Sequence, residues 1–179
     1  MFKHGFRFAA LLTIVFLLVS RVAFGLSLTV AQAETPPSTA EKKPKLVNLW
    51  QPGDPGERMN IRGRVTSING TPLSGISVSI RQADGDGDYQ ERYTTTLKTD
   101  QKGRYQFGSV VPGNYMGVRH VHIWSYQEGY QYYESRILFK GDPYLSESGN
   151  ADNAVFLEES TVNGETILFG RFDIVLTPN

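Results

Sequence analysis

Most of the chain after residue 57 consists of short runs in which every second position is apolar. Residues 76–80 show the pattern clearly, because Ile76, Val78 and Ile80 alternate with Ser77, Ser79 and, just after the run, Arg81. Alternate side chains of a β-strand point to opposite faces, so such a run predicts a strand with one buried face. Alternation, or enrichment in Thr and aromatic residues, predicts further strands over residues 59–68, 93–99, 105–107, 118–126, 132–139 and 167–176.

Turn-forming residues separate these runs, as at Asn69-Gly70, at Asp100-Gln101-Lys102-Gly103 and at Pro112-Gly113. The chain has 18 Gly and 9 Pro, no stretch with a helical period, and no repeat of fixed length. Many short strands with this punctuation indicate an all-β fold, either a sandwich or a barrel. The polar segment 141–153 is predicted to be a long loop.

The N-terminal segment has the order of features that is typical of a secretory signal peptide. Basic Lys3 and Arg7 precede an apolar run over 8–19, and Ala31-Gln32-Ala33 offers a cleavage site. Residues 1–33 are therefore expected to be removed, with the protein exported to the periplasm or secreted. The competing interpretation is an uncleaved membrane anchor, although Arg21 makes the uninterrupted apolar run short for a membrane span.

The composition of the rest of the chain indicates its domain organisation and excludes several classes of function. Residues 34–56 are rich in Pro and charge without an apolar period, which predicts a linker, and residues 57–179 then form one domain. The 179-residue chain has 18 Lys and Arg against 18 Asp and Glu, so no basic footprint for a nucleic-acid partner is expected. The chain has no cysteine, which excludes disulfides, thiolate metal sites and a cysteine nucleophile.

The tripeptide His120-Val121-His122 is the sharpest candidate for chemistry. On a strand both imidazoles fall on one face, while Val121 packs on the other. Two imidazoles at this spacing can hold one metal ion. Such a pair also occurs as two incidental surface histidines, so a metal site needs further ligands.

Two tyrosines are candidates for those ligands. Tyr89 ends the loop 82–88, and Tyr115 lies five residues before His120. A phenol has a solution pKa of about 10, so only a strongly Lewis-acidic ion such as Fe(III) would hold it as a phenolate at neutral pH. Two imidazoles and two phenolates suit Fe(III) better than Zn(II) or Ca(II). For either tyrosine alone, packing in the core or at an interface is the commoner role.

Several ordered segments together resemble the intradiol ring-cleavage dioxygenases, over a region from about Pro55 to Leu176. The matching segments are Pro55-Gly56-Glu57-Arg58, Gln82-Ala83-Asp84 with Tyr89, residues 99–107, Pro112-Gly113-Asn114-Tyr115, His120-Val121-His122, Phe139-Lys140-Gly141-Asp142-Pro143 and Phe172-Asp173-Ile174-Val175-Leu176. Each segment alone is a weak signal, but the ordered set is specific.

The resemblance implies a prealbumin-like β-sandwich with long loops that holds Fe(III) through Tyr89, Tyr115, His120 and His122. It implies cleavage of a catechol-type aromatic substrate by O2, between the two hydroxylated carbons, to a muconate-type diacid. The catecholate chelates the iron, Tyr115 leaves the metal and takes a proton, and dioxygen attacks the activated substrate. The metal acts as a Lewis-acid template in this scheme.

The chain departs from the family pattern at two positions. Gly117 stands where the family usually has an Arg three residues before the first His, and Arg119 is adjacent instead. Arg136 stands where the family usually has a Gln, and it is the candidate for the cation that polarises the substrate. The N-terminal helical dimerisation region of the catechol branch has no counterpart, and the resemblance leaves a homo-oligomer open. The rival interpretation is a non-catalytic prealbumin-like sandwich, a binding or spacer module of the cell envelope.

For two other features, a structural role is favoured over a role in binding. Asp84-Gly85-Asp86-Gly87-Asp88 superficially suggests calcium, but Tyr89 stands where an EF-hand loop needs Gly, so a solvated turn that supports Tyr89 is preferred. Tyr126, Tyr130, Tyr132 and Tyr133 could flank a ring-shaped ligand, although core and edge packing is the commoner use of such residues.

Overall fold

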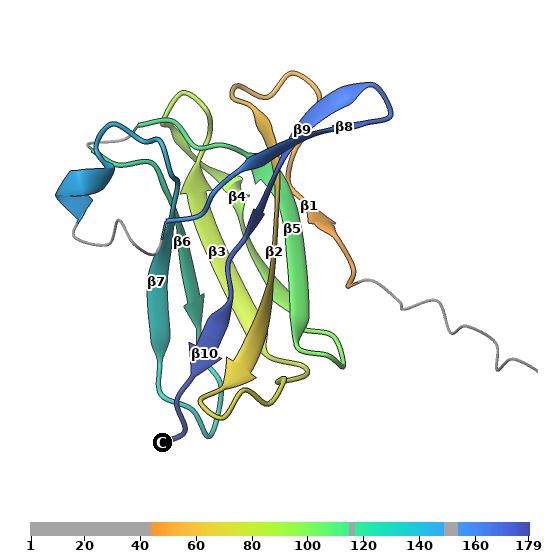
Figure 1. Ribbon diagram of the computed structural model, residues 1–179, viewed down its shortest axis with the longest axis vertical. Coiled ribbons are helices and arrows are strands. Elements are labelled where there is room, and N and C mark those ends of the chain that lie inside the picture. Colours follow the sequence, from red (N-terminus) through yellow and green to blue (C-terminus); the bar gives the residue numbers. More distant parts are fainter. Residues whose placement is uncertain (1–43, 115–116, 149–153) are drawn as a thin grey trace, which may run out of the picture. The chain divides into compact units, whose positions relative to one another are not determined.

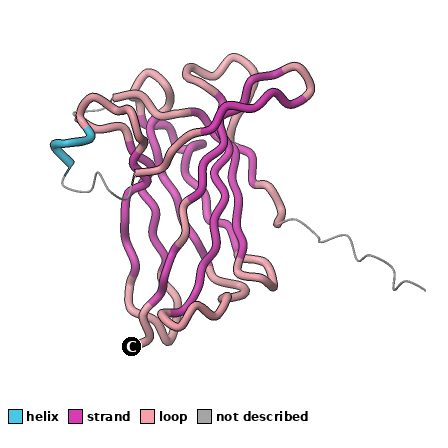
Figure 2. Tube along the Cα trace, viewed as in Figure 1, coloured by secondary structure: helices cyan, strands magenta, loops and turns pink. Residues whose placement is uncertain are grey.

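The computed structural model describes residues 44–114, 117–148 and 154–179, which form two layers of β-strands (Figures 1 and 2). The predicted signal peptide and residues 34–43 of the predicted linker lie outside this part of the chain. The strands are β1 (Val47–Asn48), β2 (Arg58–Ser67), β3 (Ser77–Ala83), β4 (Tyr89–Lys98), β5 (Arg104–Val110), β6 (His120–Ser125), β7 (Tyr133–Leu138), β8 (Glu158–Val162), β9 (Glu165–Arg171) and β10 (Ile174–Leu176). A 3₁₀ turn, η1 (Leu145–Ser148), is the one helical element described. The predicted all-β sandwich is confirmed.

The first sheet has the strand order β1-β5-β2-β9-β8, with β10 also paired to β2, and the second has the order β4-β3-β6-β7. In Figure 1 the first sheet lies in front and the second behind it. Both sheets bury one face against the other. No helix in the described ranges is long and apolar enough to cross a membrane.

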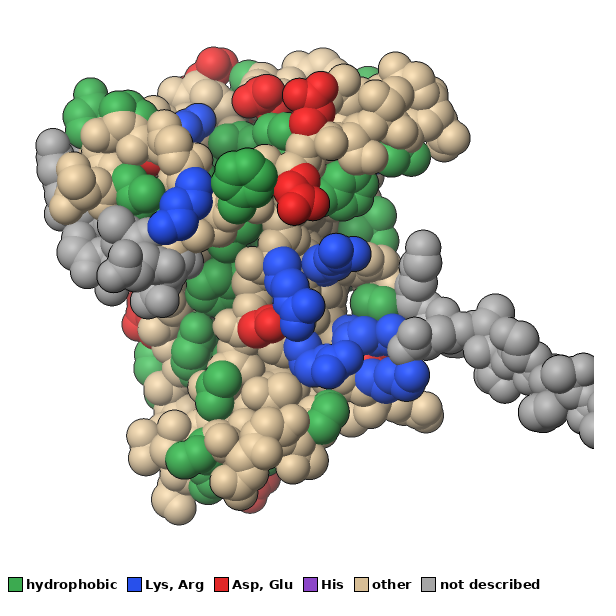
Figure 3. Space-filling model, in the orientation of Figure 1, with side chains coloured by type: hydrophobic (Ala, Val, Ile, Leu, Met, Phe, Trp, Pro, Cys, Tyr) green, Lys and Arg blue, Asp and Glu red, His purple; other side chains and the backbone are tan. Residues whose placement is uncertain are grey.

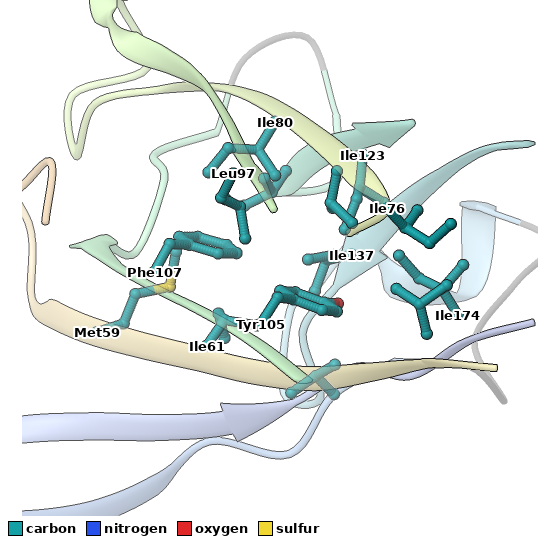
Figure 4. Close-up of a cluster of buried hydrophobic side chains, with 14 of the residues drawn as sticks. Met59, Ile61, Ile76, Ile80, Leu97, Tyr105, Phe107, Ile123, Ile137 and Ile174 are labelled. Carbon is teal, nitrogen blue, oxygen red and sulfur yellow. The ribbon is translucent and has the colours of Figure 1, made fainter. Parts of the chain in front are cut away.

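The core is the space between the two sheets, and the predicted alternation fills it. Met59 and Ile61 of β2 point inward, and Ile80 and Ile123 lie across from them on the other layer (Figure 4). Val65 of β2 belongs to the same core cluster. All five side chains are fully buried. Burial of a side chain of this size stabilises the fold by about 1.5–3 kcal/mol. The residues that alternate with them on the same strands consequently face outward, where packing does not dictate their identity.

The strand predicted over 167–176 is two strands, β9 and β10, interrupted at Phe172 and Asp173. Both pair with β2 in parallel, on either side of the break. At the break the Asp173 carboxylate accepts the backbone N–H of Arg64 at 2.8 Å, in place of a strand carbonyl. The Tyr105 hydroxyl donates to the Phe172 carbonyl, and Gly63 leaves room for this contact. Buried backbone groups are thus satisfied although the ladder is broken.

Two strands were not expected from the sequence. β8 is exposed at all five positions, so it has no buried face that would produce alternation. β1 lies within the segment predicted as a linker, where Val47 pairs in parallel with Phe107, and Leu49 packs against the core. The sandwich therefore takes up the last part of the segment 34–56.

Candidate metal centre

Strand β6 places both histidines on the outer face of the second sheet. Val121, Ile123 and Ser125 are buried, whereas His120 and His122 are half-buried. This is the arrangement that the H-x-H spacing predicted, because the apolar residues of β6 go to the core.

The two imidazoles converge through the same ring atom. Nε2 of His120 lies 3.1 Å from Nε2 of His122, and the ring planes are nearly perpendicular at 84°. Nδ1 of His120 lies 2.8 Å from the carbonyl oxygen of Val118, which can only accept, so Nδ1 carries the proton and the Nε2 lone pair is left for another partner. Orientation of a histidine by a backbone carbonyl in this way is typical of metal ligands.

The separation of the two nitrogens fits one shared ion. Two imidazoles bound at about 2.1 Å, with nearly a right angle between the bonds, hold their nitrogens about 3 Å apart. In the ranges that the structure describes, no group of three or more His, Asp and Glu side chains converges. An ion at these histidines would therefore need other donors, and a phenolate is the kind of hard anionic oxygen donor that ferric iron prefers.

Tyr89 is brought to the same face by an irregularity in the pairing of β3 with β4. Arg81 pairs with Thr94, but Ala83 pairs with Tyr89 instead of with Arg92, so the register shifts by three residues. Such bulges re-aim side chains and are common next to functional sites. The ring centroids of Tyr89 and His122 are consequently 6.4 Å apart.

Hydrogen bonds on both sides hold this irregularity in place. Arg92 forms an ion pair with Asp54 at 2.6 Å, which ties β4 to the loop before β2. The buried Asp84 accepts the backbone N–H groups of Asp86 and Asp88, each at 3.0 Å, and the Gln90 amide at 2.6 Å. Asp84 is thus used within its own turn, and the preferred interpretation of the acidic loop as a turn that supports Tyr89 agrees with these contacts.

Two arginines flank His122 across the sheet. Arg81 of β3 and Arg136 of β7 are both direct register partners of His122, so all three share the outer face. Burial, then the neighbouring His120 and the positive charge of Arg136, lower the pKa of His122; Arg81 adds to this effect and Glu134 opposes it. The environment therefore favours the neutral imidazole, which is the form that binds a metal.

A hollow adjoins the candidate centre through Tyr89. It has a volume of about 640 Å³, and Arg81, Tyr89, Thr94 and Trp124 contribute to its lining. The guanidinium carbon of Arg81 lies 4.9 Å from the centre of the Tyr89 ring. The volume is in the range of small-molecule sites, and the lining offers both a flat aromatic surface and a cation.

The position where β6 begins is fixed by a buried carboxylate. Asp142 has a fully buried side chain and accepts the backbone N–H of Arg119 at 3.0 Å and its Nε–H at 2.9 Å. Burial alone would raise the pKa of Asp142, but the Arg119 side chain and backbone N–H groups outweigh it and hold this pKa below its ordinary value. Arg119 is therefore committed to Asp142, which leaves Arg136 as the better placed of the two candidate cations.

The structure bears differently on two other positions that the sequence analysis singled out, Tyr115 and Gly117. Tyr115 lies outside the described residues, so its predicted ligation stays a prediction. Gly117 has φ of +132°, a conformation that favours glycine over the arginine usual in the family. Of the tyrosine cluster, Tyr130 and Tyr133 pack against the core, while Tyr126 and Tyr132 are exposed.

Comparison with known proteins identifies the family of the chain. A protein-family model described as a dioxygenase matches residues 34–178. The chain belongs to the intradiol ring-cleavage dioxygenase family. Catechol 1,2-dioxygenase 2 of Acinetobacter lwoffii is 29% identical over 119 residues, which are 51% of this chain and 43% of that protein. The 6-chlorohydroxyquinol 1,2-dioxygenase of Cupriavidus pinatubonensis is 26% identical over 159 residues, 70% of this chain and 56% of that one.

The fold is shared with solved members of the intradiol dioxygenase family. The crystal structure of 3-chlorocatechol 1,2-dioxygenase from Rhodococcus opacus superposes with a TM-score of 0.70 at 17% identity, over 78% of this chain and 69% of that chain. The chain spans about half the length of the curated relatives that it matches.

Sequence reasoning missed two residues around the candidate metal centre. The alternation in residues 76–81 already placed Arg81 on the outward face, but nothing in the sequence identified His122 as its neighbour. Asp142 was part of a family segment, yet its partner Arg119 lies 23 residues away, before β6, whereas Asp142 follows β7. Both contacts depend on strand pairing, which the alternation alone does not specify.

Proposed function

We propose that this chain is an Fe(III)-dependent intradiol dioxygenase that cleaves a catechol-type ring with O2 to a muconate-type diacid. The observation that carries the proposal is the convergence of the two histidine Nε2 atoms beside Tyr89, in a chain that belongs to this family. Tyr89, His120 and His122 would hold the ion, with Tyr115 as the fourth ligand. Ferric iron, when bound, supplies Lewis acidity that favours the ionised form of a catechol.

The residues of the chain bind and orient the substrate in this proposal. The hollow beside Tyr89 receives the ring, and Trp124 offers a face on which it can stack. Tyr115 accepts a proton from the catechol at its phenolate oxygen. Arg136 supplies a fixed positive charge from β7, and a preorganised cation stabilises developing negative charge better than water does.

The first experiment tests the metal and does not depend on turnover. Tyrosinate bound to Fe(III) should give a broad visible band that bleaches on anaerobic reduction. His122→Ala should lower the iron content after desalting, because three ligands leave a weaker site. Tyr126→Phe is the matched control, since this tyrosine follows β6 directly but its side chain is 81% exposed. A protein that stays colourless and retains no iron after ferric reconstitution would refute the metal site.

The second experiment measures oxygen consumption with a panel of catechols, beside the iron content of each variant. Tyr115→Phe should keep part of the iron and lose most of the turnover. Arg136→Ala should keep the iron and lower the turnover, and full activity in this variant would remove only the role of Arg136. Iron-loaded wild-type protein that consumes no oxygen with any catechol would leave the chain as a non-catalytic sandwich module of the cell envelope.

The location of the protein is a separate proposal. We infer from the order of basic and apolar residues in 1–33 that the chain is exported and cleaved after Ala33. N-terminal sequencing of protein recovered outside the cytoplasm should begin at Glu34. Recovery of intact Met1 on a membrane-bound product would contradict cleavage and support an anchor.

A further inference from the structure

The outer face of the first sheet carries a cluster of arginines that the proposed ring cleavage does not use. Figure 3 shows Lys and Arg side chains gathered near the middle of this face, with no histidine in view. Arg62 and Arg64 of β2 point outward because Met59, Ile61 and Val65 of the same strand point into the core. The candidate metal centre lies on the outer face of the other sheet, so the sandwich core separates the two.

Strand pairing sets these arginines against one another. Arg64 is the register partner of Arg104 on β5, and Arg62 is the register partner of Arg171 on β9. Residues in register share a face, and like charges directly opposite each other destabilise a sheet. Repulsion among these arginines therefore destabilises the fold, and because their side chains face outward, burial in the core does not offset it.

Internal carboxylates offset only half of this charge. Arg104 forms an ion pair with Asp100 at 2.8 Å, and Arg171 with Asp173 at 2.7 Å. The side chains of Arg62 and Arg64 have no ion pair or hydrogen bond within the ranges that the structure describes. Both are exposed and adjacent on one strand face, with about 6.6 Å between their Cα atoms at the usual rise of a strand.

The four arginines do not stand on a flat surface. They line a hollow of about 640 Å³, to which Phe169 and Leu46 add apolar walls. This volume is that of a small-molecule site. A guanidinium matches the geometry of a carboxylate or phosphate and can donate two parallel hydrogen bonds to it.

We propose that this hollow binds a small anion that carries two carboxylate or phosphate groups, one for Arg62 and one for Arg64. The two uncompensated guanidiniums set the number of negative charges, and their spacing on alternate positions of β2 sets the distance between them. The apolar walls favour a ligand with a short carbon skeleton between its charged ends. The site is independent of the proposed iron chemistry and would exist without it.

The test is calorimetric titration of the purified full chain with succinate, cis,cis-muconate and inorganic pyrophosphate, with acetate as the monovalent control. We expect the divalent anions to bind and to raise the melting temperature, and acetate to do neither. Arg62→Gln with Arg64→Gln should weaken binding at least about tenfold, because two charge-assisted pairs are lost. The relative affinity of succinate and pyrophosphate distinguishes a carboxylate ligand from a phosphate ligand.

Two further variants keep the result interpretable. Arg81→Gln with Arg136→Gln removes the same charge from the opposite face and should leave this binding unchanged. Arg62→Lys with Arg64→Lys keeps the charge without the planar fork and should bind with intermediate strength. Without ligand, the variant with both Arg62→Gln and Arg64→Gln should melt no lower than wild type, because the substitutions relieve repulsion between the arginines. This variant should also retain ring cleavage.

The proposal is overturned if the divalent anions bind no better than acetate. It is equally overturned if the variant with both Arg62→Gln and Arg64→Gln binds them as wild type does. It is also overturned if only a polymer such as heparin binds and the small anions do not compete with it, because the face would then be a docking surface for a polyanion. If wild-type protein binds the divalent anions at this hollow but shows no ring cleavage, the proposed function is contradicted and the anion site is not.

Discussion

Replacing Asp142 by asparagine tests how the fold holds the start of β6. The side chain is fully buried and accepts three N–H groups, two from Arg119 and one from the backbone of Tyr144 at 2.8 Å. Asparagine has the same shape but only one acceptor oxygen, so at least one of these donors would meet an NH₂ group. A hydrogen bond to a charged group contributes about 1.5–3 kcal/mol, and removing one partner of a buried ion pair costs about 3–5 kcal/mol.

We therefore expect Asp142→Asn to lower the free energy of unfolding by about 2–4 kcal/mol at neutral pH, below the cost of losing the partner outright. For a domain of this size the melting temperature should fall by about 6–16 °C. Urea and thermal unfolding followed by circular dichroism measure both quantities. The matched control is Glu165→Gln, whose pairing with Arg58 involves a carboxylate that is 57% exposed and should contribute less than about 1 kcal/mol.

The pH dependence gives this prediction a sign. The pKa of Asp142 is lower in the folded chain than its ordinary value of about 3.9, so its contribution is fully present above that value. It is lost as the pH falls through the lower, folded pKa, where the native carboxylate becomes protonated. The difference between wild type and Asp142→Asn should thus be constant above about pH 5 and shrink below about pH 4. A difference of less than about 1 kcal/mol at neutral pH, or one that persists in acid, would refute the reasoning.

Two further substitutions test the break between β9 and β10, with denaturant unfolding as the measurement. Tyr105→Phe removes the hydroxyl that donates to the Phe172 carbonyl and should cost about 1–2 kcal/mol; an unchanged midpoint would show that water replaces this bond. Gly63→Ala should cost at least about 3 kcal/mol, because its Cβ would lie 1.8 Å from the Phe172 carbonyl oxygen and 2.7 Å from the Tyr105 ring. Gly75→Ala is the control, since open space surrounds it and only its φ of +73° opposes a side chain, at about 1–2 kcal/mol.

Alternation predicted the strands that bury one face, and it failed where a strand has no buried face or where pairing is irregular. Residues 59–68 and 76–80 were predicted as strands because their inward positions are apolar, and they correspond to β2 and β3. β8 has no inward apolar set, so no pattern marks it. The break at Asp173 was missed because its carboxylate accepts a backbone N–H in place of a strand carbonyl. The pattern of apolar and polar residues gives no sign of such a replacement.

The candidate site was predictable to the same extent and for the same reason. The H-x-H spacing was enough to place His120 and His122 on one face, because that is a property of a single strand. The approach of Tyr89 to His122 depends on a register shift of three residues between β3 and β4, and the neighbours of Arg81 depend on which strand pairs with β3. These are relations between strands, and the period of one strand carries no information about them.

One rule accounts for both faces of this sandwich. A strand that must bury every second residue leaves the positions between them free of packing constraints, and two such positions present side chains next to each other. On β6 the pair is His120 and His122, suited to a metal ion, and on β2 it is Arg62 and Arg64, suited to an anion. The core lies between the two pairs and none of the four side chains belongs to it, so changes at one pair should add to changes at the other without coupling.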